Sequence, residues 1–201
     1  MSRMHTTPNF DGGRALILHR PHQVVDALVR QLGQIGMSAT QCWPELGDLA
    51  AIGACSALFY DADMGHDEQF PWPAGAAPMP AIALIGSEAP GRLSWAIRQG
   101  ADAHLLKPVG SGGVFAALVI AVEAFARRSS MSAENAALRV RLGQRQVLAE
   151  ATAWLMVQAN LDAEAAYDRL RRMAMDRRVG IEAAAIELVA ELRAGHVRDR
   201  A

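Results

Sequence analysis

Short apolar runs alternate with amphipathic stretches through the first half of the chain. Each run has the length of a buried strand, and together they cover residues 14–20, 37–42, 56–63, 81–86 and 103–108. Residues 23–36 carry apolar side chains at helical spacing, and residues 91–100 predict a short helix before the last run. Strands that alternate with helices in this way predict an α/β fold, with a parallel sheet covered by helices on both faces.

One segment interrupts this alternation. Residues 63–80 contain Pro71, Pro73, Pro78 and Pro80 together with two glycines, so a regular helix is not expected there. A loop of this length inside a compact domain is uncommon and is usually functional or mobile. We therefore expect residues 63–80 to form a functional or mobile loop.

From Val114 onwards the pattern becomes helical, and no proline follows Pro108. Within this long run, four residues follow one another at spacings of four, three and four, as the seam of a coiled coil requires: Met131, Asn135, Leu138 and Leu142. A polar residue at one seam position can fix the register of the two helices. The spacing predicts a coiled-coil linker at residues 126–144, which joins two copies of the chain.

The end of the chain predicts two further helices. Asn160 is a typical helix stop, and Asp162 is a typical N-cap for a helix that reaches about Arg177. Gly180 separates this helix from a last one, whose apolar residues share a face: Ile181, Ala184, Ala185, Leu188 and Leu192. Together with the end of the long helix, these segments predict a three-helix bundle.

Charge is balanced over the whole chain, which has 20 basic and 21 acidic residues and a formal net charge of −1. Any sign of a nucleic-acid partner must therefore be local. Five arginines and one acid fall within residues 169–178, namely Arg169, Arg171, Arg172, Arg177 and Arg178 with Asp176. This pattern leaves two interpretations open: a solvated face with salt bridges to nearby acids, or a face that binds phosphate.

Other features exclude several classes of protein. The first twelve residues lack the apolar region of a signal peptide, and no apolar run approaches the length of a membrane span. We therefore expect a cytoplasmic protein without membrane contact. The two cysteines fit no metal or redox spacing. The sequence contains no phosphate-cradling glycine loop, zinc spacing or nucleophile elbow, so we expect no enzymatic activity, no cofactor and no metal.

Two stretches resemble parts of a receiver domain. The sequence GADAHLLKPV is similar to the end of that fold, with Lys107 before Pro108, and LFYDADM is similar to its third strand. Asp61 then stands at the position of the phosphate-accepting aspartate. The resemblance covers residues 14–125 and implies a five-stranded, flavodoxin-like parallel sheet.

The segment after the first strand departs from this resemblance. A working receiver holds Mg²⁺ there with an acidic pair, because this cation requires oxygen ligands and neutralises charge during phosphoryl transfer. Here the stretch reads LHRPH, in which His19, Arg20 and His22 offer no carboxylate and Arg20 adds positive charge. The departure favours a degenerate site in which Asp61 and Lys107 pair or face solvent, on a domain that serves for docking. Phosphorylation of Asp61 stays the alternative.

The second half of the chain resembles an ANTAR domain over residues 136–194. The stretches RQVLAEATAWLM, EAAY and LRRMAMDRR, followed by an apolar helix, reproduce that family's pattern in order. The resemblance implies an RNA-binding surface made of ten residues: Arg145, Ala151, Thr152, Tyr167, Arg169, Arg171, Arg172, Ala174, Arg177 and Arg178. Thr152 stands where the family usually has lysine, which puts this contact in doubt.

Three of these residues keep a second interpretation. Tyr167 is suited either to stacking on a splayed RNA base or to core packing beside Leu170. Ala151 and Ala174 are suited to a close approach of helices, and Ala151 also to a close approach of RNA.

Together, the two resemblances make the chain similar to transcription antiterminators of the AmiR/NasR type. This similarity implies a homodimer that binds hairpins in nascent leader mRNA and is controlled by a ligand-sensing partner protein. The expected domains are a flexible N-terminus at 1–13, a receiver-like domain at 14–125, the linker at 126–144, the RNA-binding domain at 136–194 and a tail at 195–201. Two alternatives stay open: a response regulator phosphorylated at Asp61, and an interaction protein that ignores nucleic acid.

Overall fold

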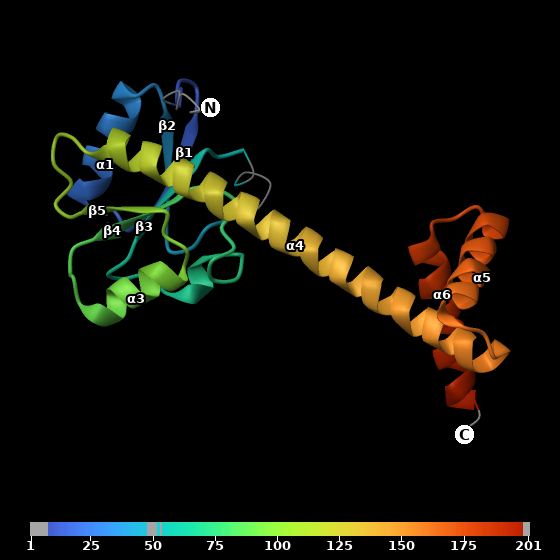
Figure 1. Ribbon diagram of the computed structural model, residues 1–201. Helices are drawn as coiled ribbons and strands as arrows, with labels where there is room; N and C mark the ends of the chain where they lie inside the picture. The colour runs from blue at the N-terminus through green and yellow to red at the C-terminus, as the bar shows by residue number, and fades with distance from the viewer. Residues whose placement is uncertain (1–7, 48–51, 53, 199–201) are drawn as a thin grey trace. The chain divides into compact units, whose positions relative to one another are not determined.

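A parallel five-stranded sheet forms the N-terminal part of the protein in the computed structural model, which describes residues 8–47, 52 and 54–198. The strands are β1 (Arg14–Leu18), β2 (Ser38–Cys42), β3 (Ala57–Asp61), β4 (Ala81–Ile85) and β5 (Ala103–Leu106). They lie in the order β2-β1-β3-β4-β5, and each neighbouring pair is parallel (Figure 1). The predicted α/β fold with a receiver-like sheet is confirmed.

Alternate side chains of the strands build two cores, one on each face of the sheet. On one face, Ile17 packs with residues of the helices α1 (Gln23–Gln34) and α4 (Val114–Ala159). On the other face, Leu18 packs with residues of α3 (Pro90–Arg98). The central strands β3 and β4 are buried along their whole length, and this explains why they read as continuous apolar runs rather than as alternating ones.

The loop at residues 63–80 is packed rather than free. The Asp67 carboxylate accepts a hydrogen bond from Trp95 Nε1 of α3 at 2.7 Å, and this bond lowers the pKa of Asp67 below its usual value. Phe70 is buried, and its ring packs against that of Trp95. The prolines leave only the short 3₁₀ turn η1 (Asp67–Gln69), as expected, but apolar packing fixes the loop on α3.

The predicted flexible N-terminus at residues 1–13 is corrected by its described part. Phe10 is buried in the core beside α1 and α4, and its ring meets that of Phe115 edge-on, with 5.9 Å between the ring centroids. A single aromatic residue in a polar stretch produces no periodicity, so the sequence pattern did not reveal this contact. Residues 1–7 lie outside the described part of the chain.

The C-terminal part is a three-helix bundle formed by the end of α4, α5 (Ala163–Arg177) and α6 (Ile181–Arg198) (Figure 1). Small and apolar side chains fill its core: Ala151, Leu155, Ala166, Leu170, Ala174, Ala184, Ala185, Leu188 and Val189. The alanines among them let the helices approach closely, because a methyl group occupies little of the space between two helix axes.

The sequence predicted the limits between the helices of the bundle. Asp162 caps α5 by accepting a hydrogen bond from the backbone N–H of Ala165 at 2.8 Å, and Asn160 ends α4 with φ of +46°. The helix α5 ends at Arg177 as expected, and Arg178 after it adopts the left-handed conformation with φ of +56°. This conformation costs a non-glycine residue on the order of 1 kcal/mol, because its Cβ crowds the following carbonyl oxygen.

Contacts divide the chain into two compact units, which we call the sheet unit (residues 1–130) and the bundle unit (residues 131–201). The predicted linker at 126–144 spans this division, within the continuous helix α4. The expected start of a tail at residue 195 is corrected, because α6 continues to Arg198. Residues 199–201 lie outside the described part.

Replacing Leu170 tests the assigned core of the bundle. Leu170 is fully buried, so Leu170→Ala leaves a cavity and should lower the free energy of unfolding of the bundle unit by about 2–5 kcal/mol. Met175→Ala, on the exposed side of the same helix, is the matched control and should change it by less than about 0.5 kcal/mol. Denaturant unfolding followed by circular dichroism measures both. Equal stability of the two variants would contradict the assigned core.

Candidate functional site

Buried Asp61 and partly buried Lys107 form an ion pair at the carboxyl edge of the sheet. Asp61 is 3% exposed, and its Oδ1 accepts a hydrogen bond from Lys107 Nζ at 2.8 Å. The backbone N–H of Asp63 donates to the same oxygen at 2.9 Å. The aspartate and the lysine that resemble receiver residues therefore pair with each other and do not face solvent.

His19 faces this pair from the end of β1, at the point where a working receiver carries acids. Its Nδ1 bonds to the carbonyl oxygen of Arg20 at 2.6 Å, and since a carbonyl oxygen only accepts, Nδ1 carries the hydrogen. The buried Nε2 lies 3.3 Å from Asp61 Oδ2 but outside hydrogen-bond geometry. The Arg20 side chain is exposed, so the charge expected at this point from Arg20 is turned to solvent.

Asp63 completes the cluster from the loop after β3. Its Oδ2 lies 2.5 Å from Lys107 Nζ and accepts a hydrogen bond from Gly86 N at 2.8 Å, while Oδ1 accepts one from Ser87 N at 2.9 Å. Burial alone raises the pKa of Asp63, but the hydrogen bonds from Lys107, Ser87 and Gly86 together lower it below its usual value. Both carboxylates of the site therefore share the ammonium group of one lysine.

The described residues contain no group of three or more His, Cys, Asp or Glu side chains able to hold a metal ion. Asp61 and Asp63 share the Lys107 ammonium instead. Since phosphoryl transfer in a receiver needs a cation at this place, the geometry favours a degenerate site over a working one.

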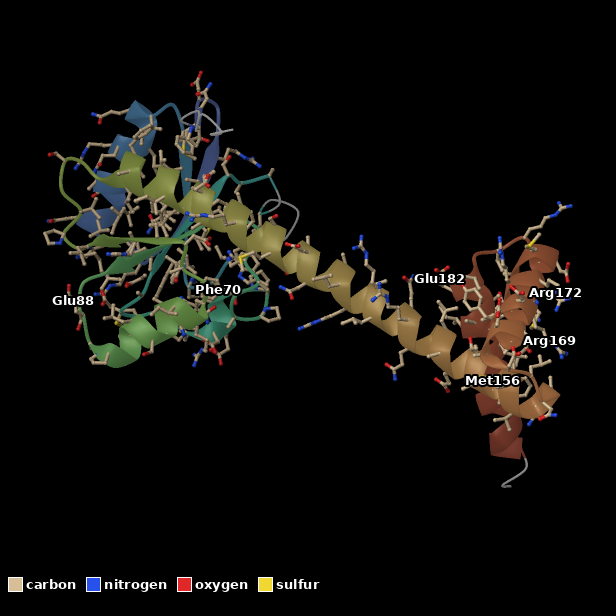
Figure 2. All side chains as sticks on the ribbon, in the orientation of Figure 1. Phe70, Glu88, Met156, Arg169, Arg172 and Glu182 are labelled. Atoms are coloured by element: carbon tan, nitrogen blue, oxygen red, sulfur yellow. The ribbon has the colours of Figure 1, made fainter. Side chains whose placement is uncertain are left out.

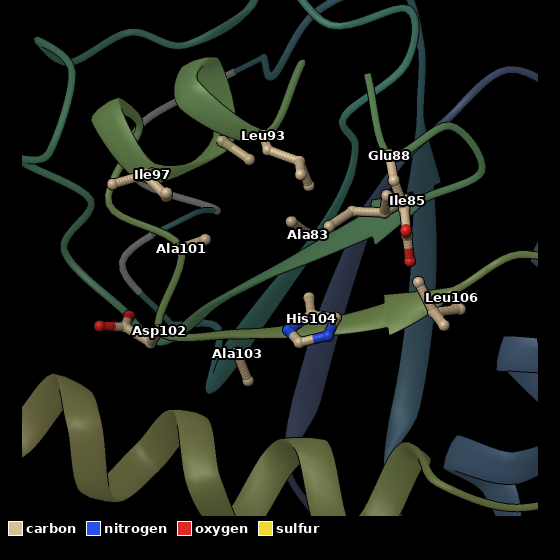
Figure 3. A pocket seen from close by; sticks show the side chains of 11 residues that line it. Ala83, Ile85, Glu88, Leu93, Ile97, Ala101, Asp102, Ala103, His104 and Leu106 are labelled. Carbon is tan, nitrogen blue, oxygen red and sulfur yellow. The ribbon is translucent and has the colours of Figure 1, made fainter. Parts of the chain in front are cut away.

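A groove of about 540 Å³ lies on the α3 face of the sheet, beside the edge strand β5. Figure 3 shows its floor, made by β4 and β5, and the side chains of α3 opposite. Most of the lining is apolar, and the titratable lining residues are Glu88, Asp102 and His104. Asp102 is engaged, because its carboxylate accepts hydrogen bonds from the guanidinium of Arg128 at 3.2 and 3.1 Å. The groove is thus an apolar surface on the sheet unit.

The arginine-rich segment lies on α5 and faces solvent. Arg169, Arg171, Arg172 and Arg178 are all exposed, and Figure 2 shows Arg169 and Arg172 on the outer side of the helix. Within the part of the chain that the structure describes, no ion pair joins any of these four to an acidic side chain. The salt-bridged interpretation therefore does not apply to them.

Arg177 differs from the other four arginines of the segment. Its guanidinium contacts Glu187 at 2.7 Å and Glu191 at 3.9 Å, and both acids lie on α6. These ion pairs join α5 to α6, so the Arg177 guanidinium stabilises the bundle and is not available to a ligand.

A shallow hollow of about 360 Å³ lies on the exposed face of α5, lined by Asp168, Arg171, Arg172 and Met175. These residues stand at positions i, i+3, i+4 and i+7, so they share one helix face. Met175 is 68% exposed, and Tyr167 on the same helix is 45% exposed. Tyr167 is therefore not a core residue, and apolar surface lies beside the arginines.

The other predicted RNA-binding residues lie in different surroundings. Arg145 is exposed on α4. Thr152 is partly buried, and its hydroxyl donates a hydrogen bond to the carbonyl oxygen of Leu148 at 2.8 Å, within its own helix. Ala151 and Ala174 are buried in the bundle core, which fits the packing interpretation and corrects their assignment to an RNA-contacting surface.

The predicted seam forms an exposed stripe along α4. Met131, Leu138 and Leu142 are between 47% and 64% exposed. The Asn135 side chain donates a hydrogen bond to the carbonyl oxygen of Met131 at 3.1 Å. The stripe has no apolar partner among the described residues of its own chain.

Comparison with known proteins agrees with both halves of this structure. The family described as AmiR, N-terminal matches residues 14–122, and the ANTAR domain family matches residues 136–189. The aliphatic amidase regulator of Pseudomonas aeruginosa is 31% identical over 179 residues, which are 88% of this chain and 90% of that protein. The chain belongs to the AmiR family.

Membership of the AmiR family confirms the prediction of an RNA-binding antiterminator with a receiver-like domain. This family is one of regulators. Two solved structures are also similar. Full-length FixJ from B. japonicum is 19% identical, with 92% of this chain and 98% of that chain covered and a TM-score of 0.45. The ShkA Rec1 domain in complex with c-di-GMP is 24% identical, with 57% and 92% covered and a TM-score of 0.39.

No described helix of this AmiR-family chain is long and apolar enough to cross a membrane. Three features of its sites were not predicted from the sequence. His19 and the bonds from Asp63 to the β4–α3 connection need the fold, because they join residues far apart in the chain. The exposure of Met175 could have been predicted from helical spacing, since the residue lies seven positions after Asp168 on the face opposite the core.

Arg178→Gly tests whether the end of α5 is strained. Glycine adopts a positive φ without crowding, so this variant should gain about 0.5–1 kcal/mol in the free energy of unfolding. Arg172→Gly removes the same charge inside the helix and should lose about 1 kcal/mol. Denaturant unfolding of both variants checks the opposite signs. A loss of stability in Arg178→Gly would contradict the strained conformation.

Proposed function

We propose that the bundle unit binds hairpin loops in nascent leader mRNA through the exposed face of α5, and that this binding prevents transcription termination. The observation that carries the proposal is a set of four exposed arginines, on α5 and at its C-cap, without acidic partners among the described residues: Arg169, Arg171, Arg172 and Arg178. Exposed guanidinium groups that form no ion pair among the described residues are suited to an anionic partner.

Arginine suits this task better than lysine. Its planar guanidinium presents a fork of donors that matches two phosphate oxygens, and its flat face stacks on exposed bases. Arg171 and Arg172 border the hollow on α5, so one ligand group reaches both. The two arginines therefore fit a phosphate and its neighbouring base.

Apolar surface beside these arginines favours single-stranded loops over duplex RNA. Tyr167 and Met175 are exposed large side chains on the same helix. The deep groove of an RNA duplex hides base edges, whereas loops splay their bases out for stacking. The Tyr167 ring and the Met175 side chain offer faces on which such bases can lie.

The exposed stripe of Met131, Asn135, Leu138 and Leu142 supports a homodimer. Burial of its three apolar side chains between two copies of the chain stabilises a dimer. Two copies of the stripe are complementary because they carry the same heptad spacing. A dimer presents two bundle units, so binding of one hairpin raises the effective concentration of the second unit near the next hairpin.

Control by a ligand-sensing partner protein, rather than by a kinase, fits the sheet unit. Asp61 is buried, and Lys107 and the backbone of Asp63 occupy its Oδ1. No acidic pair follows β1 to hold a cation. The alternative, phosphorylation at Asp61, finds no comparable support.

Charge removal on α5 tests the RNA proposal. Arg171→Ala and Arg172→Ala should each weaken binding of a paired-hairpin leader RNA about 5- to 100-fold. Each should also reduce the slope of log affinity against log salt by about one, because one fewer phosphate contact releases fewer counterions. Fluorescence anisotropy between about 50 and 300 mM KCl measures both quantities.

Arg177→Ala is the matched control, because this arginine lies on the same helix but pairs with α6. It should lower the stability of the bundle unit and leave the salt slope nearly unchanged. A folded, dimeric wild-type protein that does not bind the RNA at modest salt would overturn the proposal, as would unchanged slopes in Arg171→Ala and Arg172→Ala.

A charge in the seam tests the homodimer. Leu142→Asp buries a carboxylate in the proposed interface and should raise the dimer dissociation constant at least about 100-fold. Val140→Asp introduces the same charge at another exposed position of α4, outside the seam, and should leave the dimer intact. Sedimentation equilibrium distinguishes the two. Equal effects of both variants would place the interface elsewhere.

A further inference from the structure

Three hydrogen-bond donors converge on the Asp63 carboxylate at the carboxyl edge of the sheet. They are Lys107 Nζ at 2.5 Å, the Gly86 N–H at 2.8 Å and the Ser87 N–H at 2.9 Å. They come from two connections of the sheet unit, one after β4 and one after β5, while Asp63 comes from a third. One ammonium and two backbone N–H groups form a set of donors suited to an oxyanion.

This set, which we call the oxyanion slot, has a close fit around the carboxylate. A Cβ added at Gly86 would lie 2.7 Å from Asp63 Oδ2 and 3.1 Å from Lys107 Cε. A side chain at this position would therefore displace the carboxylate or the lysine. The glycine lets the backbone N–H approach the anion, which is an observation independent of the hydrogen bonds.

We propose that Asp63 fills, with its own carboxylate, an oxyanion-binding slot formed by Lys107 Nζ and the backbone N–H groups of Gly86 and Ser87. The slot is thus occupied without any phosphoryl group and takes none from solution. Without Asp63, the same donors bind a small tetrahedral oxyanion such as sulfate or inorganic phosphate. The filled slot explains the control without phosphorylation proposed above. Only this consequence for regulation rests on the proposed function, and the binding of the anion does not.

Occupation of the slot also fixes the backbone of the connection between β4 and α3. The bonds to Gly86 and Ser87 hold the backbone directly before Glu88, whose side chain lines the groove beside β5 (Figure 3). A receiver that binds a phosphoryl group reversibly can leave this connection in two arrangements. Here a covalently attached carboxylate keeps it in one.

Anion rescue of the full-length protein tests the slot. Asp63→Ala leaves the N–H groups of Gly86 and Ser87 without their acceptor and leaves Lys107 with Asp61 alone, so its melting temperature should fall by about 2 °C or more. Addition of about 50 mM sodium sulfate, compared with sodium chloride of equal ionic strength, should restore much of this loss, because an ion that binds only the folded state stabilises it.

Two controls separate specific binding from the general stabilisation that sulfate gives to folded proteins. The wild-type protein, whose slot is full, and Asp63→Ala/Lys107→Ala, which lacks the ammonium, should both show only the general effect. The amide resonances of Gly86 and Ser87 in Asp63→Ala should also move toward their wild-type positions as sulfate is added. An equal sulfate response in all three proteins would overturn the proposal.

Asp63→Asn provides a second readout should Asp63→Ala fail to fold. The folded-state pKa of Asp63 is lowered, so its stabilising contribution is complete above the usual carboxyl value and is lost as pH falls through the lowered one. The difference in melting temperature between wild type and Asp63→Asn should therefore shrink below about pH 4. A difference that does not depend on pH contradicts the proposal.

Wild-type protein with acetyl phosphate and Mg²⁺ completes the experiment. Because the slot is full, intact-mass measurement should find no phosphoryl group on Asp61, and finding one would overturn the inference. RNA binding is measured separately by anisotropy. A failure of the RNA proposal would leave the sulfate response unchanged, so the two outcomes can be told apart.

Discussion

The ammonium group of Lys107 is the interaction on which the carboxyl edge of the sheet depends. It lies 2.8 Å from Asp61 and 2.5 Å from Asp63, and in its absence two carboxylates would repel each other in a partly buried site. Removing one partner from such a cluster is more costly than any single hydrogen bond, because it leaves an uncompensated charge away from water. The three connections that meet here, after β3, β4 and β5, are therefore held by one positive charge.

Different faces of α5 carry the core residues and the exposed arginines of the bundle unit. Leu170 and the alanines of α5 face the other helices, while the arginines and Met175 face solvent, so the proposed RNA surface makes little demand on the core. Arg177 is the exception, because its ion pairs with Glu187 and Glu191 use an arginine for stability. A short helix can carry this many exposed arginines because packing, rather than helix propensity, supplies most of its stability.

Periodicity was enough to predict the strands, the long helix and the caps at Asn160 and Asp162, because these depend on residues close in sequence. It did not reveal the left-handed conformation of Arg178, because helix ends prefer glycine or asparagine in this conformation. It failed also for Phe10, whose burial depends on a helix about a hundred residues later. The arginines were predicted as a group, but only the fold shows that Arg177 is engaged and that Ala151 and Ala174 are buried.

The Asp63 carboxylate also has a consequence in time. A phosphoryl group on aspartate hydrolyses, and this decay gives an ordinary receiver a lifetime after which it resets. A side-chain carboxylate is a permanent part of the chain and does not hydrolyse, so it sets no such lifetime. With the slot filled as proposed, the sheet unit stores no covalent record of a past signal. Under the proposed control by a ligand-sensing partner, the duration of antitermination is set by how fast that partner associates and dissociates, and the response follows the concentration of the partner's ligand without delay from a covalent step.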